Sequence, residues 1–109
     1  MCKKVLFLLF LFFANFLFSQ NIESEKWADS IISNMSPKER ISQLFMVAAY
    51  SNKDESHTRY ISNLIQNYKI GGLMFLQGGP VRQAKLTNYY QSVSETPLMI
   101  ALDAEWGVA

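Results

Sequence analysis

The sequence predicts an α/β fold built on a parallel sheet. Three short apolar segments, 44–49, 73–76 and 98–102, have the length of strands and lack the alternation of polar and apolar residues seen in sheets with one solvated face. Segments with helical spacing of apolar residues separate them, and this alternation is typical of right-handed βαβ units. No sequence repeat is visible, so the repetition is one of architecture.

Two helices are expected before the first strand, and both lie near the junction of a lead-in segment, 20–35, with a main domain, 36–109. Apolar residues spaced by four predict the first helix over about 25–34. The second is expected over about 37–43, because a serine, a proline and a glutamate make a capping box with a proline in the first turn. The residues concerned are Trp27, Ile31 and Met35 in the first helix and Ser36, Pro37 and Glu39 in the second.

Two longer helices are expected between the strands, over 56–68 and about 81–95, where apolar residues recur at helical spacing. Gly71-Gly72 and Gly78-Gly79 are interpreted as tight turns. They are not phosphate-binding loops, because the first pair precedes a strand and no Gly-Lys-Ser/Thr follows the second.

The first 19 residues have the pattern of a secretory signal peptide. Lys3 and Lys4 precede an apolar run, 5–18, and Ser19 is a small residue before polar sequence. The run is shorter than the roughly 18–20 residues that a transmembrane helix needs. We therefore expect export to the periplasm or the cell exterior, without stable membrane insertion after cleavage. The sole cysteine, Cys2, would be lost with the signal peptide, which leaves no disulfide or thiol chemistry.

Composition limits the class of partner. The 109 residues carry a net charge of +1, and their charges are interspersed without a basic block. This pattern gives no electrostatic surface for nucleic acid, so a neutral partner is expected. A mature chain of roughly 90 residues is also small for a stable domain.

The most informative polar residues follow the third predicted strand. Asp103, Glu105 and Trp106 come directly after the segment 98–102. In parallel α/β folds, the loops at the carboxyl ends of strands carry the binding site. Carboxylates accept hydrogen bonds from sugar hydroxyls, and an aromatic face packs on a pyranose. Asp103 is therefore a candidate sugar ligand, although a helix or turn cap is an alternative role for it.

Four ordered blocks of the chain together resemble the opening of a glycoside hydrolase family 3 catalytic domain, most closely that of bacterial β-N-acetylglucosaminidases. The block MSPKERISQLF resembles the family's MTLEEKIGQL opening, and the block at Asp103 resembles its D-x-E-x-G segment. The blocks are WADS at 27–30, MSPKERISQLF at 35–45, IGGLMF at 70–75 and LDAEWG at 102–107.

The resemblance implies a TIM-type (β/α)8 barrel, of which this chain would hold about three βα units, since a whole barrel needs about 250 residues. It also implies release of a non-reducing-end β-linked sugar, N-acetylglucosamine preferred, by a retaining mechanism without metal or organic cofactor. By the same resemblance Asp103 binds hydroxyls of the sugar and is not the nucleophile. The nucleophile and the acid/base are expected beyond Ala109, so no catalytic residue is assigned in this chain.

Other candidates have less specific patterns. Asp103 and Glu105 are unsuited to be a catalytic pair, because adjacent carboxylates cannot readily flank opposite faces of one sugar ring. Glu105 is interpreted as a supporting residue or helix start, and Gln77 as a residue that could approach substrate. His57, the sole histidine, is expected to be a solvated residue at a helix start rather than a metal ligand, because a hydrolytic zinc site normally needs three protein ligands.

Three alternatives remain beside the leading interpretation. One is a β-glucosidase or β-xylosidase of the same family, and another is a non-catalytic carbohydrate-binding protein. A Rossmann-type dehydrogenase is disfavoured, because no Gly-x-Gly-x-x-Gly turn follows a strand. By itself the 109-residue chain is expected to be inactive and poorly folded, with an unpaired strand edge and uncovered apolar faces.

Overall fold

A computed structural model describes residues 22–105 and residue 107. The predicted signal peptide, 1–19, Cys2 and Trp106 lie outside the described residues. The chain divides between Ser30 and Ile31 into two compact units. No helix within the described part of the chain is both long and apolar enough to cross a bilayer.

The two predicted N-terminal helices are present. Helix α2, Ile22–Asn34, begins earlier than the sequence indicates. Helix α3, Pro37–Ser42, has the predicted capping box, because the Ser36 Oγ accepts from the Glu39 N–H at 3.3 Å and the Ser36 N–H donates to Glu39 Oε2 at 2.8 Å. Hydrogen bonds to the carboxyl of Glu39 from the Ser36 side chain and from the Ser36 N–H lower the pKa of this carboxyl.

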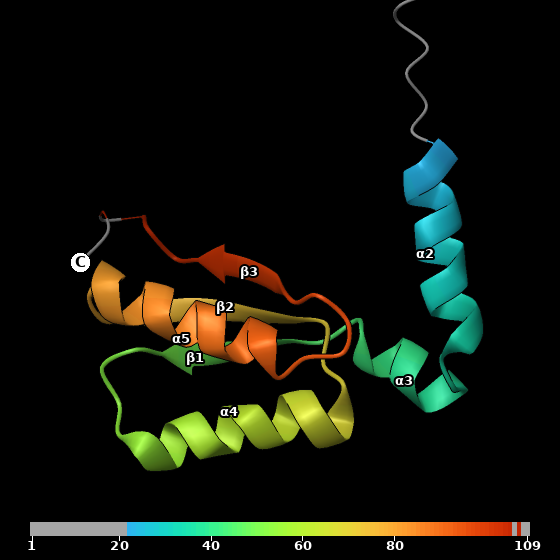
Figure 1. Cartoon of the computed structure of the whole chain (residues 1–109). Helices are drawn as coiled ribbons and strands as arrows, with labels where there is room; N and C mark the ends of the chain where they lie inside the picture. Colours follow the sequence, from blue (N-terminus) through green and yellow to red (C-terminus); the bar gives the residue numbers. More distant parts are fainter. Residues whose placement is uncertain (1–21, 106, 108–109) are drawn as a thin grey trace, which may run out of the picture. The chain divides into compact units, whose positions relative to one another are not determined.

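The second unit contains a three-stranded parallel sheet in the order β1-β2-β3, with strands β1 (Met46–Tyr50), β2 (Gly72–Gln77) and β3 (Met99–Leu102). Helix α4, Glu55–Tyr68, connects the first two strands, and helix α5, Pro80–Ser92, connects the last two (Figure 1). The predicted α/β class with parallel strands is therefore what the described residues show.

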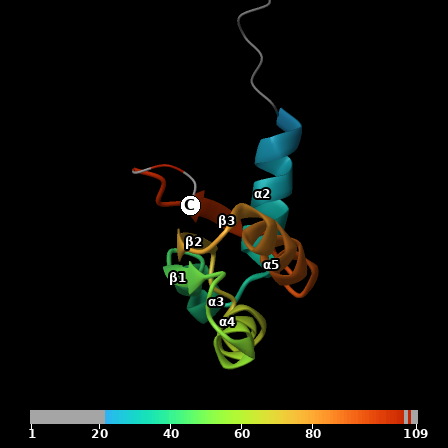
Figure 2. The ribbon, with the colours of Figure 1, turned by 90° about the vertical axis from the view of Figure 1, so that its left-hand side faces the viewer.

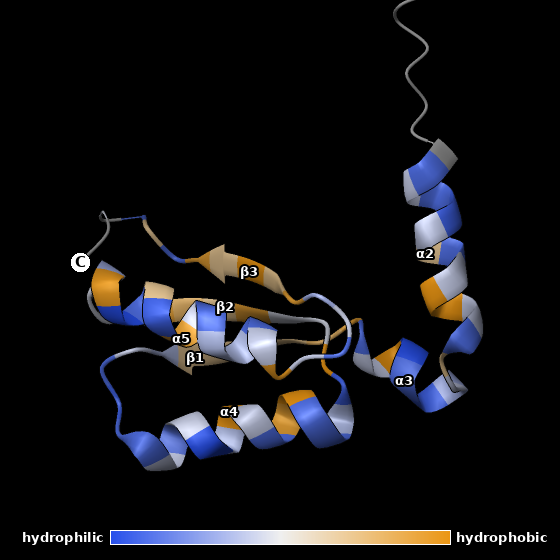
Figure 3. Ribbon diagram, in the orientation of Figure 1, coloured by the Kyte–Doolittle hydropathy of each residue, from blue (hydrophilic) through white to orange (hydrophobic). Residues whose placement is uncertain are grey.

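Both connecting helices pack on the same face of the sheet. Figure 2 views the sheet from the carboxyl ends of its strands and shows α4 and α5 on one side of it. The strands are largely hydrophobic along their length, whereas α4 and α5 mix hydrophilic and hydrophobic residues (Figure 3). The core consists of Ala49, Leu73 and Phe75 from the strands, Ile61, Ile65 and Tyr90 from the helices, and Ile70 and Leu98 beside them.

The other face of the sheet is open within the described chain. Met46, Met74 and Met99 on this face are 41%, 37% and 69% exposed. The register places Ala48, Met74 and Ala101 side by side on the three strands. The continuous apolar strands predict burial on both faces, and this prediction is wrong for the described residues, because they supply a layer of helices on one face only.

The first strand begins later than predicted. Leu44 and Phe45 were expected in a buried strand, but they are 83% and 59% exposed. Their N–H groups donate to the carbonyls of Ile41 and Ser42, so the backbone continues the turn at the end of α3. Apolar character alone did not locate the start of the strand.

The sheet carries one irregularity. Ala49 pairs with Phe75, but Tyr50 pairs with Gln77, so Leu76 is an extra residue in β2. An insertion of this kind is a β-bulge, which bends the strand locally. It lies where β2 reaches the carboxyl edge of the sheet.

The two glycine pairs differ from one another. The interpretation of Gly71-Gly72 as a tight turn is wrong, because neither has a positive φ and Gly72 lies in β2. Glycine is needed at position 71 because a Cβ there would collide with the backbone oxygen of Gln43. Gly78 has a φ of 112° and makes the predicted turn, and Gly79 is the N-cap of α5.

Candidate functional site

A hollow of about 390 Å³ lies at the carboxyl edge of the sheet. The strands β2 and β3 end at this hollow, and the loops that follow them form its wall. Its polar side chains come from three separate connections, which the parallel sheet brings to one edge. The lining residues are Asn52, Leu76, Gln77, Gly78, Gly79, Arg82, Leu102, Asp103 and Gly107.

Asp103, the sequence-predicted sugar ligand, lies in this hollow directly after β3. Its backbone N–H donates to the carbonyl of Phe75 at 2.9 Å, which extends the β2–β3 ladder by one bond and fixes the start of the loop. The side chain is exposed. No hydrogen bond or ion pair joins its carboxylate to another described residue, so the oxygens are available to an incoming ligand.

Gln77 and Asn52 contribute two amides to the same hollow. Gln77 ends β2, and its carbonyl accepts from the Ser51 N–H at 3.0 Å. The Asn52 Nδ2 lies 3.5 Å from the Gln77 Oε1, at the long limit of a hydrogen bond. This contact is weak, so both amides can rearrange to bind hydroxyl groups.

Arg82 brings the hollow its positive charge. It is the third residue of α5, and it forms no ion pair with another residue in ranges 22–105 and 107. Sequence reasoning missed Arg82 and Asn52, although both follow the ends of predicted strands closely. The carboxyl ends of parallel strands meet at one edge, and this rule indicates the region of the site but not which of its side chains turn toward the hollow.

The remaining candidate residues lie elsewhere. Glu105 is exposed and does not line the hollow. Tyr89 and Tyr90 lie on α5 with ring centroids 5.6 Å apart, and Tyr90 is buried in the core, where burial raises the pKa of its hydroxyl. Tyr90 therefore packs in the core and does not line the hollow.

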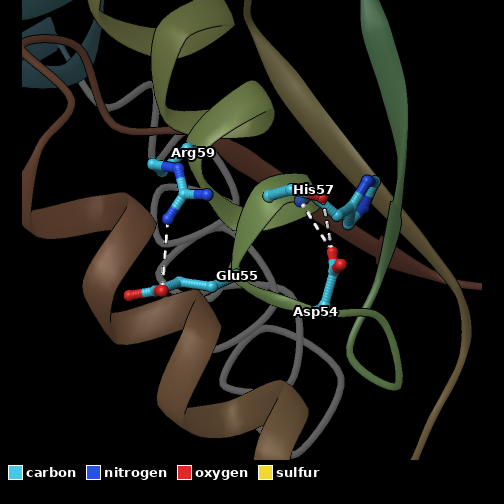
Figure 4. A network of polar contacts seen from close by, with 5 residues as sticks. Asp54, Glu55, His57 and Arg59 are labelled. Atoms are coloured by element: carbon cyan, nitrogen blue, oxygen red, sulfur yellow. Dashed lines mark hydrogen bonds and ion pairs between the residues drawn. The ribbon is translucent and has the colours of Figure 1, made fainter.

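His57 lies at the start of α4, as predicted, but its imidazole is half-buried rather than solvated. The Nε2 atom accepts a hydrogen bond from the Tyr50 N–H at 3.2 Å. Asp54 caps the helix by accepting from the His57 N–H at 3.3 Å (Figure 4). The prediction of a fully solvated ring is wrong because the loop after β1 folds the ring back onto the end of that strand.

Neither a metal site nor a catalytic pair is formed by the described residues. Within ranges 22–105 and 107, no three His, Cys, Asp or Glu side chains lie close enough together to hold a metal ion. The hollow contains a single carboxylate, that of Asp103, together with hydrogen-bond donors and acceptors. This set of groups is suited to binding a polar, hydroxyl-rich molecule.

Comparison with known proteins adds no assignment. A scan against protein-family models finds no matching family, and a search of curated proteins finds no match. The functional assignment therefore depends on the residues and the geometry described above.

Proposed function

We propose that this chain forms the first part of a glycoside hydrolase catalytic domain of the family 3 type. The complete enzyme would be exported and would release a β-linked sugar from the non-reducing end of a glycan, with N-acetylglucosamine preferred. In this proposal Asp103 binds the hydroxyls of the sugar. The nucleophile and the acid/base are supplied by residues outside this chain.

The observation that carries the proposal is the position of Asp103. Its carboxylate lies at the carboxyl edge of a parallel sheet, in a hollow of about 390 Å³, with amide groups from two neighbouring connections. A carboxylate accepts hydrogen bonds at two oxygens, and an amide both donates and accepts, which is the combination that adjacent sugar hydroxyls require. Charge-assisted hydrogen bonds of this kind are among the stronger ones in proteins.

The path of the chain supports the barrel in this proposal. The strands follow one another in chain order, and both connecting helices lie on one face. Doubly wound sheets place helices on both faces, whereas a (β/α)8 barrel keeps all of them outside and fills its interior with apolar side chains from the strands. The open face with Met46, Met74 and Met99 has the character of such an interior.

The choice of sugar depends on the sequence resemblance alone. A β-glucosidase or β-xylosidase of the same family would use the same hollow and the same aspartate. The second class of function, carbohydrate binding without hydrolysis, is favoured by one observation, namely that the described part of the hollow contains only one carboxylate. Retaining hydrolysis needs two carboxyl groups about 5–5.5 Å apart.

The test is Asp103→Ala in the full-length protein, assayed with chromogenic β-N-acetylglucosaminide and β-glucoside. Loss of a hydrogen bond to a charged group reduces kcat/KM by about 10- to 100-fold. The matched control is Glu25→Ala, which removes an exposed carboxylate on α2 outside the hollow, and which is expected to change kcat/KM less than about twofold.

A loss below about threefold for Asp103→Ala would contradict the role of this residue. Binding of the sugars to the wild-type protein without hydrolysis of either substrate would support the non-catalytic alternative. The ratio of the two kcat/KM values decides between an N-acetylglucosaminidase and a glucosidase.

A further inference from the structure

The imidazole of His57 occupies an unusual place at the end of β1. The Ser51 N–H donates toward β2, to the carbonyl of Gln77. Because successive N–H groups of a strand point to opposite edges, the preceding N–H, that of Tyr50, points away from β2. β1 is the edge strand of the described sheet, and it is the His57 Nε2 that receives this outward N–H, at 3.2 Å.

This hydrogen bond requires one protonation state of the ring. A ring nitrogen accepts a hydrogen bond only when it carries no proton, so His57 must be neutral with its proton on Nδ1. In the imidazolium form, both ring nitrogens are donors. Protonation would therefore place the Nε2–H against the Tyr50 N–H and break the contact.

The surroundings of His57 favour the neutral form. Burial, and then the positive charge of Lys53, lower its pKa below the ordinary value of 6.5, while Asp54 acts weakly in the opposite direction. The ring lies between Tyr50 of β1, with centroids 5.5 Å apart, and Tyr60 of α4, at 6.3 Å. The Lys53 Nζ lies 3.9 Å from the centroid of the Tyr50 ring.

Two further charged residues of α4 are near His57, and they are paired with each other. Glu55 and Arg59 form an ion pair of 3.2 Å one turn apart (Figure 4). Their charges offset one another, so Lys53 and Asp54 are the charged groups whose effect on the imidazole is resolved.

The backbone held by His57 leads directly into the hollow. Ser51, next to Tyr50, is buried, and its hydroxyl donates to the carbonyl of Gln77 at 3.4 Å. Asn52 follows and lines the hollow beside Gln77. The position of the Asn52 amide therefore depends on the backbone conformation at the end of β1. The hydrogen bond to His57 holds this backbone on the edge of β1 that faces away from β2.

We infer that His57 is a positioning residue for the hollow: by accepting the Tyr50 N–H it holds the β1–α4 loop, residues 51–54, in the ligand-binding arrangement, and its protonation releases the loop. The effect on ligand binding rests on the proposed sugar-binding function, whereas the effect on the loop does not. The site would then bind its ligand well at neutral pH and less well in mildly acidic surroundings.

The direction of the pH effect follows from the lowered pKa. The contact is fully present above about pH 6.5, the ordinary histidine value. As the pH falls below that value and through the lower pKa of the folded state, the neutral ring and its hydrogen bond are lost.

The loop is tested first, without any ligand. Amide hydrogen exchange of peptides that span residues 46–54 is measured by mass spectrometry on the full-length protein at pH 5 and pH 7.5, corrected for the intrinsic pH dependence of exchange. We expect protection to fall about three- to tenfold at pH 5, the effect of losing one hydrogen bond. Equal protection at both pH values would overturn the inference whatever the ligand.

The second test is the pH dependence of KM for the substrate that the protein hydrolyses, or of Kd for N-acetylglucosamine if it only binds. For the wild type, KM or Kd is expected to rise about three- to tenfold from pH 7.5 to pH 5. His57→Gln retains an acceptor that does not titrate, so its profile should be flat near the neutral wild-type value. For His57→Ala, KM or Kd should not change with pH and should stay near the higher value that the wild type has at pH 5.

Lys53→Gln distinguishes a titrating imidazole from a merely structural one. Removal of the positive charge should raise the pKa of His57 and move the pH-dependent change in KM or Kd to higher pH. The value of KM or Kd at pH 8 should be unchanged. A profile for His57→Gln that still follows the wild type, or a transition that Lys53→Gln leaves in place, would refute the role of His57. If the exchange experiment succeeds and neither substrate nor sugar is bound at any pH, the proposed function fails and the loop contact stands.

Discussion

The two faces of the sheet are built from the same three strands and differ in what covers them. On one face Leu73 and Phe75 are 0% and 1% exposed beneath α4 and α5. On the other, Met74 lies between them in sequence and is 37% exposed. Alternation of side chains along a strand makes this difference possible within three consecutive residues.

The difference shows which face of the sheet has its packing partners within the described residues. The apolar side chains of the covered face pack against α4, α5 and one another, and they are buried within the second unit. The open face is apolar but has no partner within the described residues. An apolar sheet face of this kind is typically buried by a second layer, which in the proposed barrel would be the side chains of further strands.

The largest effect is expected for Phe75→Ala. Phe75 is fully buried between the sheet and the helices, and its truncation leaves a large cavity. We expect the free energy of unfolding to fall by about 3–5 kcal/mol. Urea denaturation of the full-length protein measures this, and a change below about 1 kcal/mol would mean that the covered face is not the core.

Met74→Ala sharpens the comparison, because its effect depends on what lies over the open face. In the full-length protein we expect a loss of about 2–3 kcal/mol, since the barrel interior would bury this side chain. Val81→Ala, at a residue that is 68% exposed on α5, serves as the control for an exposed apolar truncation. A loss for Met74→Ala no larger than that of the control would contradict the barrel.

Gln91→Leu tests the hydrogen bonds that join α5, on the covered face, to the segment before β3. The Gln91 side chain donates to the carbonyl of Leu98 at 2.8 Å and accepts from its N–H at 2.9 Å, which ties α5 to the start of β3. Loss of both bonds leaves two backbone groups without partners, and we expect a destabilisation of about 2 kcal/mol. The exposed residue Asn88 on the same helix provides the control, since Asn88→Ala should change stability by less than about 0.5 kcal/mol.

The smallest effect is expected for Asp54→Ala, at the start of the helix that covers the buried face. Hydrogen bonds from the Ser56 hydroxyl at 2.6 Å and from the His57 N–H lower the pKa of the Asp54 carboxyl below 3.8. Its stabilising effect is therefore present above the unfolded-state pKa and is lost as the pH falls through the lower folded-state pKa.

Denaturation at pH 7 and at pH 3 measures this effect. The variant should be less stable than the wild type at pH 7, and the two should converge as the solution becomes more acidic. A difference that stays constant over the whole range would show that the carboxylate charge has no part in capping α4.

Local signals in the sequence were sufficient for much of the fold. The capping box at Ser36, the break after Tyr68 and the alternation of strands and helices depend on neighbouring residues, and they were predicted. Gly71 and His57 were misinterpreted because their roles depend on partners that the chain brings from other elements. Gln43 approaches Gly71 from the end of α3, and Tyr50 approaches His57 from β1.

The candidate site was predicted in part. The position of Asp103 after the third strand could be read from the sequence, because polar residues at the carboxyl ends of parallel strands converge. Arg82 and Asn52 were missed because each lies a few residues into a loop or helix, where the sequence does not indicate which side chains turn toward a common hollow.

The extra residue in β2 has a consequence for how this segment tolerates change in length. By strict alternation Gln77 would follow Leu73 and Phe75 onto the covered face, where its amide would meet the hydrophobic core. The insertion of Leu76 removes Gln77 from that series and leaves it at the hollow. Deletion of Leu76 would leave Gln77 directly after Phe75 and still opposite Tyr50, so the extra residue adds a bend at the end of the strand without changing the face on which the Gln77 amide lies.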